Sequence, residues 1–214
     1  MKTIRVIGLT GQTGAGKSTV STFAAAHGAG IIDADIVARE ITQPGSPCLE
    51  QLCAAFGSDI VDENGVLIRS LLAQRAFKDR EQTQRLNAIT HPAILAKTKT
   101  YIEALRHKHK NIILFDAPQL FESGGEVLCD AVIAVTAPQA VRLERIMRRD
   151  HLSREDALRR MHAQHDAAYY TERADYVIDG AATLEDVHAA AWKILREIAG
   201  ERWTKQQGRL RDEQ

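Results

Sequence analysis

The sequence predicts an α/β fold, a five-stranded, mainly parallel sheet flanked by helices. Short runs of apolar, largely β-branched residues alternate with longer segments in which apolar residues recur at helical spacing. Each short run is almost continuously apolar, which is typical of strands buried on both faces of a parallel sheet. With 214 residues, 44% of them hydrophobic, the chain can bury the core that such a fold requires.

Five segments have the strand pattern and four have the helix pattern. The predicted strands span residues 4–9, 30–33, 112–115, 131–135 and 176–178. The predicted helices span residues 17–27, 138–149, a segment that starts near 153, and 184–198. Gly28 is expected to end the first helix, and Ser153 with Asp156 forms an approximate capping box for the third.

The segment between the second and third predicted strands is too long for a simple crossover connection. Its patterning is mostly helical, and a turn cluster, QPGSP, lies near its start. We therefore expect an inserted helical subdomain. The expected organisation is a core of residues 1–38, 111–137 and 174–200, a helical subdomain of 39–110, an arginine-rich lid of 138–173 and a polar tail of 201–214.

Composition argues against several classes of partner. The 28 basic and 28 acidic residues give a net charge of +0, so no bulk field attracts nucleic acid or an anionic membrane. The three cysteines, Cys48, Cys53 and Cys129, form no C-x-x-C pair, and because a strand pattern starts at residue 4 we expect no targeting segment. No apolar stretch approaches the roughly 20 residues of a membrane helix. We expect a cytoplasmic protein, a monomer or a weak homo-oligomer.

The stretch GLTGQTGAGKST, residues 8–19, matches the phosphate-loop pattern G-x-x-x-x-G-K-[ST]. Glycines let successive backbone N–H groups form a nest for phosphate oxygens, and the helix that follows adds its unpaired N–H groups. Lys17 is expected to reach the terminal phosphates and Ser18 to ligate Mg²⁺. The predicted ATP-binding residues are Gly11, Gln12, Thr13, Gly14, Ala15, Gly16, Lys17, Ser18 and Thr19.

Carboxylates follow two of the predicted strands. Asp33 and Asp35 come after the second strand, and Asp116 ends the apolar run of the third. Because ligands bind at the carboxyl edge of such sheets, these groups are expected near the loop. Each can hold Mg²⁺ or accept a proton from an attacking hydroxyl, and the alternative is a cap on the next helix. We favour the functional role for Asp33 and leave both roles open for Asp35.

Arginines are concentrated in the expected lid. Arg142, Arg145 and Arg149 have the spacing of one helix face, so a lid could deliver them to a transferring phosphoryl group. The alternative is a solvated basic face. The arginines of this segment are Arg142, Arg145, Arg148, Arg149, Arg154, Arg159 and Arg160.

A nucleotide bound at this loop could serve switching, mechanical work or group transfer. No N-K-x-D segment is present, which argues against a GTPase, and the D-x-x-G-like residues 62–65 are better explained as a turn. Size and charge favour a small-molecule kinase. A nucleoside or nucleotide kinase, or a nucleotide-dependent binding module without turnover, stays open at this point.

Several ordered segments resemble the dephospho-CoA kinase family over about residues 4–196. They are GLTGQTGAGKSTV, IIDADIVAREI, PGSP, FGSDIVDENGVLIRSLL, HPAI, DAPQLFESG and RADYVIDG. The resemblance implies a P-loop NTPase core, a helical acceptor-binding insertion and a helical lid. It also implies transfer of the γ-phosphoryl group of ATP, with Mg²⁺, to the ribose 3′-hydroxyl of dephospho-CoA, which is the last step of coenzyme A synthesis.

The resemblance also implies residue roles. The catalytic set would be Asp33 as the general base, Lys17, Arg145 and Arg149. The metal would be held by Ser18 and Asp116. The acceptor side would be formed by Asp33, Asp35, Arg69, His91, Pro118 and Leu120, and Gln164 matches a recurring position in the lid. The chain departs from the family pattern at Gln119, at Arg142, where glutamine is common, and at Gly180, where asparagine is frequent.

Overall fold

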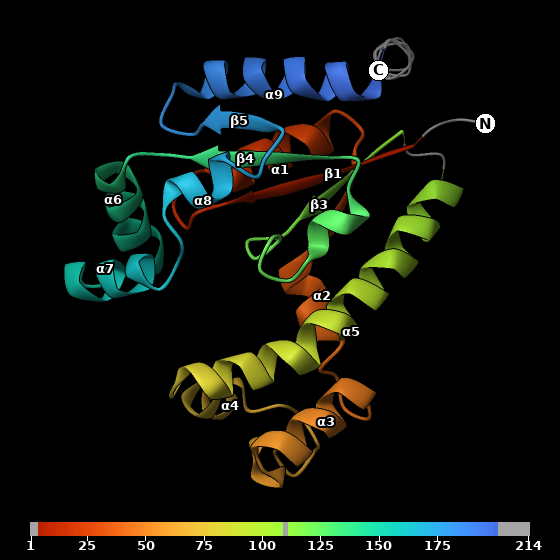
Figure 1. Cartoon of the computed structure of the whole chain (residues 1–214), viewed down its shortest axis with the longest axis vertical. Helices are drawn as coiled ribbons and strands as arrows, with labels where there is room; N and C mark the ends of the chain where they lie inside the picture. Colours follow the sequence, from red (N-terminus) through yellow and green to blue (C-terminus); the bar gives the residue numbers. More distant parts are fainter. Residues whose placement is uncertain (1–3, 109–110, 201–214) are drawn as a thin grey trace. The chain divides into compact units, whose positions relative to one another are not determined.

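The computed structural model describes residues 4–108 and 111–200 (Figure 1). The expected polar tail, 201–214, lies outside these residues. The chain divides into two compact units, one formed by Met1–Ile32 with Ala104–Gln214 and the other by Asp33–Glu103. The second unit therefore begins six residues earlier than the helical subdomain expected at 39–110, because a helix starts directly after the second strand.

All five predicted strands are present, each within two residues of the expected range. Their order in the sheet is β2-β3-β1-β4-β5, and β1 pairs in parallel with both β3 and β4. Leu9 lies opposite Asp116 and Gly11 opposite Val135, so the carboxyl ends of these strands share one edge. The strands are β1 Arg5–Gly11, β2 Gly30–Asp33, β3 Ile112–Asp116, β4 Ala131–Thr136 and β5 Tyr176–Asp179.

Helices α1 (Lys17–Ala26) and α9 (Leu184–Ala199) share one core with the sheet. Alternate residues of each strand point to this face. The core includes Ile7, Leu9, Ile112, Leu114, Ile133 and Val135 from the strands and Val20, Ala24, Val187, Ala191 and Leu195 from the helices. Gly8, between two of these strand residues, faces the opposite side, where Leu120 packs against it. The near-continuous apolar strands are thus explained by burial on both faces.

The expected lid, residues 138–173, contains three helices. Helices α6 (Gln139–Asp150) and α7 (Arg154–His162) pack together through Leu143, Ile146, Ala157 and Met161. Ser153 caps α7, since its Oγ accepts the N–H of Asp156 at 3.1 Å, as the capping box predicted. The short helix α8 (Ala167–Thr171) was not predicted. It carries Tyr170, which is fully buried.

The second unit is helical, with α2 (Ala34–Glu40), α3 (Pro47–Phe56), α4 (Arg69–Ala76) and most of α5 (Arg80–His107). Its buried residues include Leu49, Leu52, Phe56, Ile60 and Leu72. The hydroxyl of Tyr101 on α5 donates to the carboxylate of Glu40 on α2.

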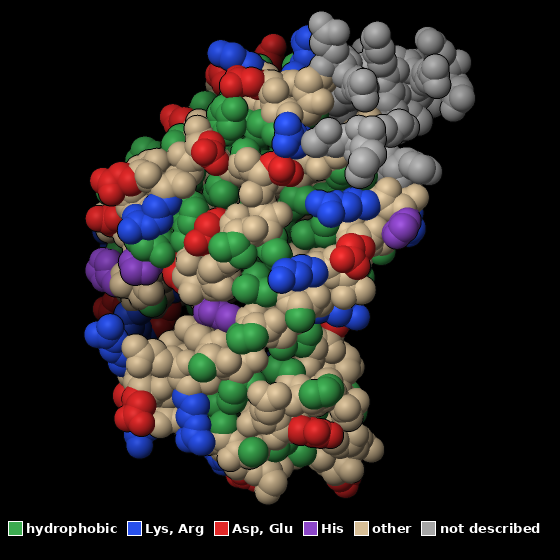
Figure 2. All heavy atoms as spheres, turned by 45° about the vertical axis from the view of Figure 1, so that its right-hand side comes forward, with side chains coloured by type: hydrophobic (Ala, Val, Ile, Leu, Met, Phe, Trp, Pro, Cys, Tyr) green, Lys and Arg blue, Asp and Glu red, His purple; other side chains and the backbone are tan. Residues whose placement is uncertain are grey.

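Charged side chains are distributed rather than segregated. On the face shown in Figure 2, Lys and Arg side chains are interspersed with Asp and Glu. Among the described residues, no helix is both long enough and apolar enough to cross a bilayer.

Candidate active site

The loop between β1 and α1, residues 11–16, has a backbone that only glycine adopts easily at two key positions. Gly11 has φ 144° and Gly14 has φ 78°, both in the left-handed range. A Cβ at Gly11 would lie 2.2 Å from the carbonyl oxygen of Val135, and one at Gly14 would lie 2.8 Å from that of Arg142. The loop therefore lies directly against β4 and α6. We call residues 11–19 the phosphate loop.

Helix α1 begins at Lys17 with no side-chain cap and no acidic residue in its first turn. The N–H groups of Lys17 and Ser18 and the positive end of the helix dipole are therefore available to an anion, whereas the N–H of Thr19 donates to the carbonyl oxygen of Gly16 at 3.0 Å. Ser18 is exposed and Thr19 is half-buried at the same helix end. This is the local geometry that the sequence motif predicted.

The ammonium group of Lys17 forms an ion pair with the carboxylate of Asp116 at the end of β3. Their side chains are only 19% and 10% exposed, so the pair is largely shielded from water. A cation and a carboxylate thus lie beside the phosphate loop. Ser18 and Asp116 offer hydroxyl and carboxylate oxygens, the hard donors that Mg²⁺ prefers together with phosphate and water.

The lid arginines have three different environments. Arg145 donates to the carbonyl oxygens of Gly14 and Ala15, both at 3.3 Å, and to that of Gly180 at 2.8 Å. Arg149 is paired with Asp150 through two hydrogen bonds of 2.7 and 2.8 Å, and this bonding raises the pKa of Arg149. Arg142 is 5% exposed, so it is not part of a solvated basic face, and the lid role of the segment stays a prediction.

Asp33 is the last residue of β2 and the N-cap of α2, in the second unit. Its Oδ1 accepts the N–H of Asp35 at 2.8 Å and that of Ile36 at 3.4 Å. No hydrogen bond from the described residues reaches Oδ2. Capping therefore occupies one carboxylate oxygen and leaves the other for a second role. Asp35 itself is exposed in the first turn of α2.

The expected acceptor residues are divided between the two units. Arg69, exposed at the start of α4, donates to Thr42 Oγ1 at 3.0 Å, and His91 is half-buried within α5. In the first unit, the carbonyl oxygen of Pro118 accepts from Thr10 Oγ1 at 3.2 Å. Leu120 is fully buried, so its side chain packs in the core instead of facing solvent.

Two hydrogen bonds join the phosphate loop to the turn after α7, and no sequence pattern predicts them. Thr13 N–H donates to Gln164 Oε1 at 2.8 Å, and Gln12 Nε2 donates to the carbonyl oxygen of His165 at 3.0 Å. The partners are more than 150 residues apart in sequence, so no local pattern could reveal them. The family resemblance points to Gln164 but does not predict its hydrogen-bond partner.

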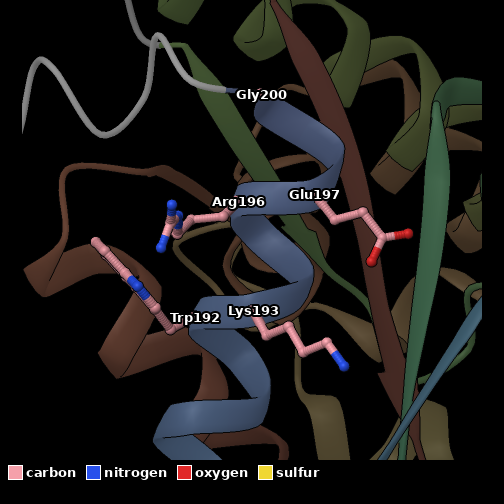
Figure 3. Close-up of a pocket in the computed structure, with 5 residues that line it drawn as sticks. All are labelled: Trp192, Lys193, Arg196, Glu197 and Gly200. Carbon is pink, nitrogen blue, oxygen red and sulfur yellow. The ribbon is translucent and has the colours of Figure 1, made fainter.

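A hollow of about 410 Å³ lies elsewhere, along the C-terminal half of α9 (Figure 3). Trp192 and Arg196 extend to one side of the helix, and Lys193 and Glu197 extend to the other. Because α9 runs back across the sheet, this end of the helix lies at the amino ends of the strands, opposite the phosphate loop (Figure 1). The hollow is therefore separate from the candidate site.

Comparisons with known proteins agree with this geometry. A family model described as dephospho-CoA kinase matches residues 5–186. The dephospho-CoA kinase of Corynebacterium diphtheriae is 40% identical over 202 residues, covering 94% of this chain and 97% of that protein. The enzyme of the same name from Corynebacterium jeikeium is 43% identical over 181 residues, covering 85% and 93%.

Solved structures give the same result. The dephospho-CoA kinase from Campylobacter jejuni superposes with a TM-score of 0.67 at 29% identity, covering 91% of this chain and 96% of that one. A shikimate kinase from Acinetobacter baumannii, at 19% identity and a TM-score of 0.52, covers 92% and 94% and shares the fold. The predicted P-loop kinase fold and the resemblance are thus confirmed, and the chain belongs to the dephospho-CoA kinase family.

Proposed function

We propose that this chain transfers the γ-phosphoryl group of ATP to the ribose 3′-hydroxyl of dephospho-CoA, giving coenzyme A and ADP. The observation that carries the proposal is the phosphate loop with Lys17 held by Asp116 at the carboxyl edge of the sheet. Family membership supports the choice of acceptor over a nucleoside or nucleotide.

The phosphate loop, residues 11–19, is proposed to bind ATP through those of its N–H groups that have no acceptor among the described residues, including those of Gly14, Gly16, Lys17 and Ser18. The phosphates carry several negative charges and would compete with Asp116 for the Lys17 ammonium group. Ser18 and Asp116 would then hold Mg²⁺, which neutralises charge on the β- and γ-phosphates when bound. The loop and Lys17 orient the γ-phosphoryl group, and that positioning supplies most of the catalysis in such transfers.

Asp33 is proposed as the general base. As the 3′-oxygen bonds to the γ-phosphorus, the hydroxyl proton passes to Asp33, and the bond from the γ-phosphorus to the bridging oxygen of ADP breaks. Oδ2 suits this role because Oδ1 already caps α2. Arg145 and Arg149 are proposed to offset charge on the phosphoryl oxygens, Arg149 after exchanging Asp150 for phosphate.

The acceptor is proposed to contact Asp35, Arg69, His91, Pro118 and Leu120, of which Leu120 can contribute only through its backbone or by shaping the wall, because its side chain is buried. We place the enzyme in the cytoplasm, where ATP is available.

An acceptor assay tests the proposal. Purified protein is incubated with Mg-ATP and either dephospho-CoA or a panel of nucleosides and nucleotides, and ADP formation is followed. We expect rapid turnover with dephospho-CoA, a product phosphorylated at the 3′-position by NMR, and loss of activity on chelation of the metal. Turnover with a nucleoside alone would favour the other kinase class, and tight ATP binding without ADP formation under any acceptor would indicate a binding module.

A further inference from the structure

Both main-chain polar groups of Thr13, in the phosphate loop, are held by side chains of the lid. The N–H of Thr13 donates to Gln164 Oε1 at 2.8 Å, and its carbonyl oxygen accepts from Arg142 Nε at 2.9 Å. Arg142 comes from α6, whereas Gln164 follows α7. Two separate parts of the lid therefore fix one residue of the loop.

The environment of Arg142 indicates that its side chain interacts with the protein interior and not with solvent. The residue is 5% exposed, and its burial lowers the pKa of the guanidinium group. Nη2 is buried and has no hydrogen-bond partner among the described residues. The bond from Nε to Thr13 is therefore the main directional interaction of this buried cation with the protein.

The Thr13 carbonyl and the Gly14 N–H belong to one planar trans peptide, in which the C=O and N–H point in opposite directions. Arg142 draws the carbonyl toward α6, so the Gly14 N–H must point away from α6. No described residue accepts a hydrogen bond from that N–H. It is therefore aimed at the side of the loop where the amide nest for phosphate forms.

Glycine at position 14 makes this orientation dependent on an external bond. With φ 78° and no Cβ, Gly14 tolerates either orientation of the preceding peptide at low cost. Neighbouring contacts hold the rest of the loop, since Arg145 donates to the carbonyls of Gly14 and Ala15 and Gln12 donates to that of His165. The orientation of the 13–14 peptide is left to Arg142. The 12–13 peptide is held at its N–H by Gln164 and at its carbonyl oxygen by the N–H of Ala15, which donates at 3.1 Å.

We propose that Arg142 and Gln164 are positioning residues that orient the peptides on either side of Thr13, so that the loop presents its amides to the nucleotide phosphates. Neither residue touches the nucleotide in this role. The inference rests on the proposed ATP site, but it concerns nucleotide affinity and not the identity of the acceptor.

A matched pair of substitutions separates the hydrogen bond from the charge. In both arginine and glutamine, a nitrogen follows Cδ directly, so Arg142→Gln places an amide N–H donor where Nε now lies. Arg142→Met keeps similar bulk and removes the donor. Gln164→Met removes the acceptor for Thr13 N–H in the same way. Each variant is compared with the wild type by calorimetric ATP binding without acceptor, by steady-state kinetics and by thermal unfolding.

We expect Arg142→Met and Gln164→Met each to weaken ATP binding about 5- to 10-fold, the effect of losing one hydrogen bond. Arg142→Gln should stay within about twofold of the wild type. The KM for dephospho-CoA should change little in all three variants. The fold loss of ATP affinity in the double variant should be smaller than the product of the two single losses, because both residues act through Thr13.

Three results would overturn the inference. One is ATP affinity within twofold of the wild type in both methionine variants while Tm falls, since that indicates a structural role only. Another is an equal loss in Arg142→Gln and Arg142→Met, since that assigns the effect to charge. The third is a loss of ATP affinity in the double variant that equals the product of the two single losses, since that means the two residues act independently. If Arg142→Met does not fold, Gln164→Met and Arg142→Gln decide the matter. If the protein does not phosphorylate dephospho-CoA, the measurements of ATP binding still test this inference, because they are made without acceptor.

Discussion

Gly180 lies so close to Ala15 that a Cβ atom at position 180 would come within 1.8 Å of the Ala15 carbonyl oxygen. The carbonyl oxygens of both residues accept hydrogen bonds from Arg145, at 2.8 Å for Gly180 and 3.3 Å for Ala15. The turn after β5 and the phosphate loop are thus packed backbone against backbone, and Arg145 joins them. Gly180 departs from the asparagine that is frequent in the family, and this chain has room for no side chain there.

Gly180→Ala should therefore displace the phosphate loop. The added methyl group meets a backbone atom that cannot rotate away, so we expect ATP affinity to fall by about tenfold or more and the protein to be destabilised by about 1–3 kcal/mol. Calorimetry and thermal unfolding measure both effects. Ala181→Gly, which changes the same turn without adding an atom, is the control. Wild-type ATP binding in Gly180→Ala would show that the loop accommodates the methyl group without consequence.

Asp33→Asn should separate catalysis from helix capping. Asparagine is as good an N-cap as aspartate, so α2 should keep its start and Tm should change little. An amide cannot accept the hydroxyl proton, so kcat should fall by about 10²- to 10⁴-fold while ATP affinity stays nearly intact. Asp35→Asn is the neighbouring control and should retain far more activity. Normal turnover in Asp33→Asn would remove this residue from the role of base.

Lys17→Ala should damage both nucleotide binding and chemistry. The substitution removes the cation that offsets phosphate charge and breaks the ion pair with the largely buried Asp116. We expect weaker ATP binding and a loss of kcat of at least about 10²-fold. Lys17→Ala/Asp116→Asn also removes the charge of the largely buried carboxyl group, so it should recover part of the thermal stability without recovering activity. An unchanged ATP titration together with full activity in Lys17→Ala would contradict the assignment.

Asp150 gives a pH-dependent contribution to lid stability. Its hydrogen bond to Arg149, and then the charges of Arg149 and Arg160, hold the pKa of this carboxyl below its ordinary value of 3.8. A depressed pKa stabilises the folded state above the unfolded-state pKa, and this stabilisation is lost as the pH falls through the folded-state value. Asp150→Asn should therefore lower Tm by a few degrees at pH 7.

The difference in Tm between Asp150→Asn and the wild type should shrink as the pH falls from about 4 through the lower folded-state pKa of Asp150, because the wild-type carboxyl becomes neutral over this range. Unfolding curves from pH 3 to 8 measure this. A difference in Tm that is independent of pH would mean that the carboxylate charge contributes nothing to the lid.

Much of this molecule was predictable because its signals are local. The strands are predicted by apolar runs, and the start of α7 is predicted by the Ser153 cap. The phosphate loop is predicted by a short motif whose glycines adopt a left-handed backbone. The order of carboxylates along the chain also predicted that those after β2 and β3 lie at the carboxyl edge of the sheet, since parallel strands end at one edge.

Other features depend on distant partners. The helical spacing of Arg142, Arg145 and Arg149 is evident in the sequence, but it does not reveal their different environments. Arg142 is buried, Arg145 donates to carbonyl oxygens of the phosphate loop, and Arg149 pairs with Asp150. Helix α8 is too short to have a clear periodicity of its own, and the burial of Tyr170 supports it.

The fold class, the phosphate loop and the carboxylates that follow β2 and β3 can be predicted from local patterns, because backbone propensity and burial periodicity act over a few residues. Which lid side chains hold Thr13, and why position 180 has no room for a side chain, becomes evident once the chain is folded. Those outcomes depend on packing between segments more than 120 residues apart, where fractions of an ångström separate a hydrogen bond from a clash.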